Sequence, residues 1–100
     1  MKISYTDTLN FKWIKTGSTS GYYLLMVEGE SHFRRVEADM ILGLGGYYDF
    51  SITTYKNNKR QGAVKRGRFK ARNITEAKRT LEVEVISRLE DKWPGIGVTR

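Results

Sequence analysis

The sequence contains no cysteine and only one histidine and one proline. Without cysteine the chain has no disulfide framework, no thiolate nucleophile and no cysteine zinc site, which fits a reducing compartment. Its longest apolar run is the six residues 22–27, far short of the roughly 20 that cross a bilayer. The N-terminal stretch also lacks the apolar run of a secretory signal. We therefore expect a soluble, cytoplasmic protein.

Motifs that carry catalysis or bind metals are also missing. The single histidine, His32, lies in a strand-like segment and is interpreted as structural. Four acidic residues flank it: Glu28, Glu30, Glu37 and Asp39. Their spacing fits no metal-binding loop, so a solvated surface is the simpler interpretation. The GLGG stretch at 43–46 is not followed by the GK[ST] of a phosphate loop. The sequence predicts a non-enzymatic protein without catalytic residues, metal or cofactor.

Acidic residues are missing from one long segment. KNNKRQGAVKRGRFKAR, residues 56–72, has eight Lys or Arg and no Asp or Glu. The whole chain has 18 basic and 11 acidic residues, so without these eight the balance becomes ten against eleven. The entire positive excess therefore lies in one segment. Such a patch is typical of proteins that bind polyanions, although a solubilising hairpin tip is the plain alternative.

The apolar pattern predicts mostly β-structure before the final third of the chain. Five segments have strand-like character: 9–15, 22–28, 31–38, 47–56 and 62–71. The second is apolar on both faces, which predicts a central or covered strand. Turns are predicted at GSTSG (17–21) and NNKR (57–60). The stretch 39–46 fits either a buried strand or one helical turn.

A helix is predicted after the last strand. Asn73 and Glu76 have capping-box spacing. Six apolar residues then recur at steps of three or four: Ile74, Ala77, Leu81, Val85, Leu89 and Trp93. Pro94 and Gly95 stop the helix. We predict a single domain over residues 1–100, of α+β class, in which an antiparallel four- to five-stranded sheet packs against one long C-terminal helix.

The strand around Phe69 predicts where the cations point. If Phe69 faces the helix, then Lys65, Gly67 and Ala71 share its face, and the alternate residues face away. At Gly67 a ligand backbone can approach closely. The outward residues Arg66, Arg68 and Lys70 form a positive stripe. The turn residues Lys56, Lys59 and Arg60 extend it. The candidate nucleic-acid-binding residues are Lys56, Lys59, Arg60, Lys65, Arg66, Arg68, Lys70 and Arg72, with Tyr47 and Tyr55 for stacking or hydroxyl contacts.

These segments also resemble a known type of domain. The strand GGYYDFSITTY, the basic turn KNNKRQG, the strand VKRGRFKAR and the helix NITEAKRTLEVEV are similar to the arm-type DNA-binding domains of phage and transposon integrases. Those domains lay a sheet in the major groove. The resemblance implies DNA contacts by Arg66, Arg68 and Lys70. It implies structural roles for Phe69, Glu76 and Ala77. The spacing from Phe69 to Glu76 is longer here, and small phage proteins that inhibit host defence look similar.

Two functions therefore remain open. The first is a small phage-type protein that binds DNA or RNA through the basic hairpin. The second is a phage-encoded, anti-CRISPR-like inhibitor that binds an acidic host protein or a nucleoprotein complex. In the second case the aromatic anchors are Trp13, Tyr22, Tyr23, Tyr47 and Tyr55. Composition does not separate the two, because both use arginine and tyrosine.

Overall fold

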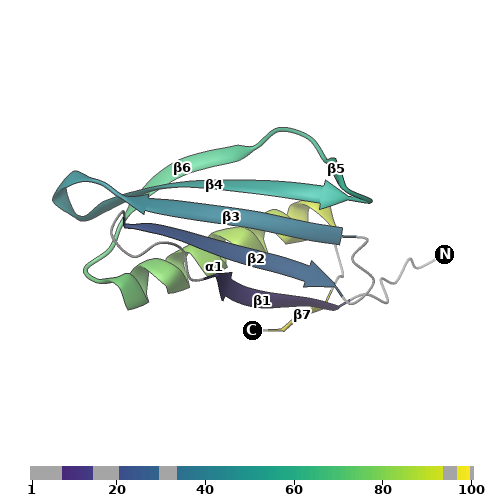
Figure 1. Cartoon of the computed structure of the whole chain (residues 1–100), viewed down its shortest axis with the longest axis horizontal. Coiled ribbons are helices and arrows are strands. Elements are labelled where there is room, and N and C mark those ends of the chain that lie inside the picture. The colour runs from purple at the N-terminus through teal and green to yellow at the C-terminus, as the bar shows by residue number, and fades with distance from the viewer. Residues whose placement is uncertain (1–7, 15–20, 30–33, 94–96, 100) are drawn as a thin grey trace.

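A twisted sheet covered on one face by a single helix forms the body of the protein (Figure 1). The computed structural model describes residues 8–14, 21–29, 34–93 and 97–99. The elements in chain order are β1 (Thr8–Ile14), β2 (Tyr22–Gly29), β3 (Arg34–Leu42), the 3-10 turn η1 (Leu44–Gly46), β4 (Tyr47–Lys56), β5 (Lys59–Arg60), β6 (Lys65–Lys70), α1 (Ile74–Lys92) and β7 (Gly97–Thr99).

The strands β1 to β4 form an antiparallel meander, in which each strand pairs with the next. The full strand order is β5-β4-β3-β2-β1-β7, and β6 pairs with β4 farther along the same edge as β5. Only β7 runs parallel to its neighbour, β1, among the described strands. The predicted α+β class with one long C-terminal helix is confirmed. The short strand β7 adds a strand beyond β1 that was not predicted, and β5 shares the β4 edge with β6.

Alternation along the strands selects the face that packs against α1. In β4, Tyr48, Phe50 and Ile52 share one face and are buried, and the residues between them are half-buried or exposed. The same alternation buries Leu25 and Val27 of β2. The prediction that the apolar segment 22–28 is a central strand is confirmed, because β2 lies between β1 and β3. One face of the sheet thus builds the core, and no described element covers the other face, which we call the open face.

The helix α1 begins and ends where the sequence predicts. Asn73 caps it, because its side-chain oxygen accepts a hydrogen bond from the Glu76 backbone N–H at 2.9 Å. The predicted apolar stripe lies against the sheet, with Ala77, Leu81, Val85 and Leu89 buried. The backbone N–H of Trp93 donates to the Leu89 carbonyl at 2.7 Å and closes the last turn. Pro94 and Gly95 lie outside the described residues.

The turns refine the predicted boundaries. The ambiguous stretch 39–46 is strand through Leu42 and a 3-10 turn from Leu44, so each interpretation holds for one half. The turn predicted at 57–60 contains only Asn57 and Asn58, both with positive φ. Lys59 and Arg60 already belong to β5. Residues 15–20 and 30–33, which hold most of the predicted GSTSG turn, the start of the predicted third strand and His32, lie outside the described residues.

Gly67 has a different role from the predicted one. It faces the helix side of the sheet, where the Phe50 ring occupies the space a side chain would need. A Cβ added to Gly67 would lie 2.7 Å from two ring carbons of Phe50. Glycine at this position therefore serves internal packing, and the close approach of a ligand backbone is not its reason.

We expect the substitution Gly67→Ala to lower the free energy of unfolding by about 1–3 kcal/mol, because the Phe50 ring must move inside a packed core. Chemical denaturation measures the change. Gly43→Ala is the matched control, since Gly43 has an extended backbone with φ of −107° and a Cβ there would lie 3.5 Å from the Tyr47 carbonyl oxygen. Equal destabilisation by both substitutions would contradict this packing role.

Candidate nucleic-acid interface

The pairing of β6 with β4 fixes the side on which the cations lie. Arg66 is opposite Ser51, Arg68 is opposite Asp49 and Lys70 is opposite Tyr47. Directly paired residues in an antiparallel sheet point to the same face. Tyr48 and Phe50 point to the helix side, so the three cations lie on the open face. All three are exposed, and the residues between them are half-buried, which is the alternation the sequence predicts.

Arg60 continues the row toward the turn, because it pairs with Tyr55 on the same face. We call Arg60, Arg66, Arg68 and Lys70 the basic strip. It follows the rim of the sheet beside β4 from Tyr55 to Tyr47 (Figure 1). At the rise of a β-strand this is about 26 Å.

The other basic candidates point elsewhere. Lys65 is on the helix side, where its Nζ lies 3.2 Å from Oε2 of Glu84. Lys56 pairs with Lys59 beside the turn. By strand alternation both point to the helix side, opposite to Tyr55 and Arg60. The eight cations predicted together therefore do not share one surface.

One member of the basic strip has a carboxylate partner. The Nε of Arg68 lies 2.8 Å from Oδ1 of Asp49, and this hydrogen bond raises the pKa of the Arg68 guanidinium further. Arg60, Arg66 and Lys70 form no ion pair with any carboxylate in the described part of the chain. The strip thus keeps three positive charges that are not balanced by a close carboxylate.

The two candidate tyrosines differ in their availability. Tyr47, at the start of β4, is 43% exposed. Lys70 Nζ and Arg68 Cζ lie 5.6 Å and 5.9 Å from its ring centroid. Gly45 lies beside the ring, since a Cβ added there would be in ordinary van der Waals contact with Cδ2 of Tyr47 at 3.6 Å. Tyr47 therefore presents a partly exposed ring, and the two cations over it lie farther from the ring centroid than Arg35 lies from that of Tyr55.

Tyr55 is covered by an arginine. Arg35 lies over its ring with Cζ 4.5 Å from the centroid. That guanidinium also contacts Glu37 at 3.3 Å and Asn58 at 3.2 Å, so it is held in place. The ring face that a base would need is occupied by Arg35, and only Tyr47 keeps the stacking role that the sequence suggests for both.

Carboxylates lie on the open face next to the basic strip. Glu37 and Asp39 of β3 and Glu28 of β2 all point there by the strand register. Asp39 is fixed by two hydroxyl donors, Ser51 at 2.7 Å and Tyr22 at 3.1 Å. Burial and then the Asp39 charge raise the pKa of Tyr22, which keeps it a donor. Sequence reasoning treated these residues as solvated surface and missed their position, which only strand pairing reveals.

No cluster of three or more potential metal ligands occurs within residues 8–14, 21–29, 34–93 and 97–99. Two of the residues weighed as ligands from sequence, Glu30 and His32, are not among these.

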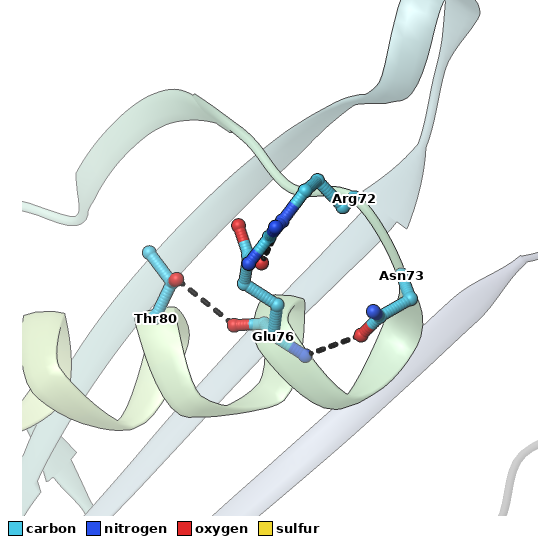
Figure 2. Close-up of polar contacts among 4 residues, drawn as sticks. All are labelled: Arg72, Asn73, Glu76 and Thr80. Atoms are coloured by element: carbon cyan, nitrogen blue, oxygen red, sulfur yellow. Dashed lines mark hydrogen bonds and ion pairs between the residues drawn. The ribbon is translucent and has the colours of Figure 1, made fainter.

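The N-terminus of α1 uses its polar residues for its own cap (Figure 2). Arg72 Nε lies 2.9 Å from Oε2 of Glu76, and Thr80 Oγ1 donates to the Glu76 carbonyl at 2.9 Å. A shallow depression of about 270 Å³ here is lined by Arg72, Asn73, Thr75, Glu76 and Arg79. The Glu76 carboxylate already pairs with Arg72 in that depression. Arg72 therefore lies beyond the end of β6 and belongs to the helix end, where it pairs with Glu76.

Two of the predicted aromatic anchors help hold the helix on the sheet. Trp13 Nε1 donates to Oε2 of Glu82 at 3.0 Å. Lys78 Nζ lies 5.2 Å from the Trp13 ring centroid and 5.8 Å from that of Tyr23. Both rings are half-buried against the core. Trp13 and Tyr23 thus serve the contact between sheet and helix.

No protein-family model, curated protein sequence or solved structure matches the chain. In the part of the chain that the structure describes, no helix has both the length and the apolar character needed to span a membrane. The function is therefore argued from the chemistry of the open face and its rim.

The pKa of Glu76 is below its usual value, mainly because Arg72 donates a hydrogen bond to the carboxylate. A lowered pKa means that this pair stabilises the fold at neutral pH and that its contribution is lost as the pH falls through the folded-state pKa. We expect Arg72→Met to raise the pKa of Glu76 toward its ordinary value, as measured by NMR titration of the carboxyl carbon. Arg79→Met is the control and should raise it less. An unchanged Glu76 pKa in Arg72→Met would contradict the assignment.

Proposed function

We propose that the protein is a small, non-enzymatic nucleic-acid-binding protein and that the basic strip on β5 and β6 contacts the phosphate backbone. The observation that supports this most is the alignment of four cations on one face of the rim strands β5 and β6, three of them without a close carboxylate. An accessible tyrosine ring stands at one end of the row.

The chemistry of these side chains fits a polyanion. Guanidinium groups donate up to two parallel hydrogen bonds to a phosphate and stay charged at every relevant pH. A row of phosphate contacts gives affinity that depends on salt and hardly on sequence. Because β6 pairs with no described strand other than β4, a ligand reaches this row from the rim as well as from above the sheet. DNA and RNA both carry the backbone that this site needs.

The resemblance to arm-type integrase domains agrees with this function and suggests a phage or mobile-element origin. The residues it implies for DNA contact, Arg66, Arg68 and Lys70, are all members of the strip.

We expect the double substitution Arg66→Ala with Lys70→Ala to weaken binding about equally for all sequences. The slope of log K against log salt should fall in magnitude by about 1 for each lost phosphate contact, and so by about 2. Fluorescence anisotropy with a labelled oligonucleotide at several salt concentrations measures both effects.

Lys65→Ala is the matched control for this experiment. It removes a cation from the same strand, but one that faces Glu84 on the helix side, so the slope should stay close to that of the unmodified protein. If the unmodified protein binds neither DNA nor RNA at low salt, the proposed function is wrong.

A second candidate function has its own observation. Near the start of β4, three apolar side chains are exposed: Ile41 by 44%, Leu42 by 48% and Leu44 by 94%. Exposed apolar groups mark interaction sites, and tyrosine and arginine are the usual anchors of protein interfaces. This group favours the alternative of a phage-encoded inhibitor that binds a host protein.

For that alternative, we expect a stoichiometric protein partner to copurify from nuclease-treated host lysate and to be lost with Leu44→Ser. Val83→Ser is the matched control, since Val83 is 55% exposed on the helix side of the molecule. A partner retained equally by both variants would show that Leu44 is not an anchor.

A further inference from the structure

We infer that the ligand of the basic strip is a single strand of nucleic acid, with one base stacked on the Tyr47 ring, and that duplex is disfavoured. This inference rests on the proposed function and names its substrate class. Three features of the open face carry it: the single row of cations, the ring of Tyr47 and the carboxylates of β2 and β3.

The cations form one row, one strand wide. Arg66, Arg68 and Lys70 are alternate residues of β6, so their spacing along the rim is about 6.6–7 Å. Each step of the row can meet one phosphate of an extended chain. No second row of cations runs parallel to it on β4 or β3, whose described open-face residues include Asp49, Asp39 and Glu37. One sugar-phosphate backbone fits this arrangement, and a second finds no partner.

Tyr47 can stack on an unpaired base, which a single strand exposes and a duplex does not. Bases of single strands stack on aromatic rings, whereas paired bases are already stacked on each other. The ring is 43% exposed. Lys70 and Arg68, at 5.6 Å and 5.9 Å from the ring centroid, can contact the phosphates that flank a stacked base. The ring and the row therefore serve one nucleotide chain together.

The carboxylates oppose a duplex. A major groove is about 12 Å wide between its phosphate rims, and neighbouring strands lie about 4.8 Å apart. With one rim on β6, the other falls two to three strands away, on β3 or β2. On the described open-face positions of these two strands, Glu28, Glu37 and Asp39 stand against one cation, Arg35, which pairs with Glu37 at 3.3 Å. Asp39 is held by neutral hydroxyls, which stabilise its charge without cancelling it.

The first test compares one sequence in two forms. A labelled single strand of about 12 nucleotides lies within the site sizes of single-strand-binding modules, and its duplex is the second ligand. We expect the protein to bind the single strand more tightly in anisotropy titrations at the same salt. DNA and RNA versions of the single strand show which sugar is preferred.

Substitutions at the two tyrosines test the stacking contact. Tyr47→Leu keeps an apolar side chain but removes the ring, and should lower affinity for the single strand between about 5-fold and about 100-fold. Tyr47→Phe should bind nearly as well as the unmodified protein. Tyr55→Leu should have a smaller effect than Tyr47→Leu, because Arg35 already covers that ring. Circular dichroism and thermal unfolding verify that each variant is folded.

The substitution Asp39→Asn tests the exclusion of duplex. It removes a charge from the open face and should increase affinity for the duplex while leaving the single strand almost unaffected. Asp91→Asn, an exposed position at the end of α1, is the charge-matched control. An unchanged duplex affinity in Asp39→Asn contradicts the role given to the carboxylates.

The outcomes separate this inference from the proposed function. If duplex binds as tightly as the single strand, or if Tyr47→Leu leaves single-strand affinity unchanged while Arg66→Ala with Lys70→Ala lowers it, the inference is wrong and the nucleic-acid function stands. If the protein binds neither form, both are wrong.

Discussion

The packing of Phe69 against β4 fixes the register on which the outer surface depends. Its ring lies 5.6 Å from that of Tyr48, nearly parallel at 17°, and 5.6 Å from that of Phe50. A slip of one residue would turn Phe69 to the open face and the three outward cations into the core. The cost of burying charges without partners forbids that alternative. The same contact that completes the core therefore holds Arg66, Arg68 and Lys70 outward in one row.

Cations on a rim strand have a second physical effect. An unpaired strand edge invites pairing with another chain, and charged residues on it prevent this. Protection of the edge needs charged residues at the rim, but they can lie on either face of the sheet. In β6 the charge without a carboxylate partner gathers on the open face, next to an exposed ring, while Lys65 on the other face is paired with Glu84. Protection of the edge explains the amount of charge but not this distribution.

The sequence predicted the features that short-range periodicity controls. The alternation of β4, the outward row of β6 and the stripe and cap of α1 each follow from residues within one element, and all are observed. The length of the turn at 57–60 was overestimated because Lys59 already pairs with Lys56. Strand β7 was missed, since a three-residue strand that pairs with β1 leaves no periodic signal.

Contacts between distant segments decided the rest of the candidate site. Eight cations close in sequence are divided between two faces and a helix end, because Lys65 meets Glu84 and Arg72 meets Glu76. Two tyrosines eight positions apart on β4 differ because Arg35 of β3 covers only Tyr55. Such differences depend on which strands become neighbours, and the residue pattern within one segment does not predict that pairing.

The charges of the open face form a gradient from rim to centre. The basic strip lies on β5 and β6, and the carboxylates lie on β3 and β2, one or two strands beyond β4. A polyanion near this face is attracted at the rim and repelled toward the middle, so its favoured direction is along β6 and not across the strands. Because Ser51 and Tyr22 hold Asp39 in place, the negative side of the gradient is as fixed as the strand register. A ligand drawn to the rim thus meets Tyr47 at the end of its path.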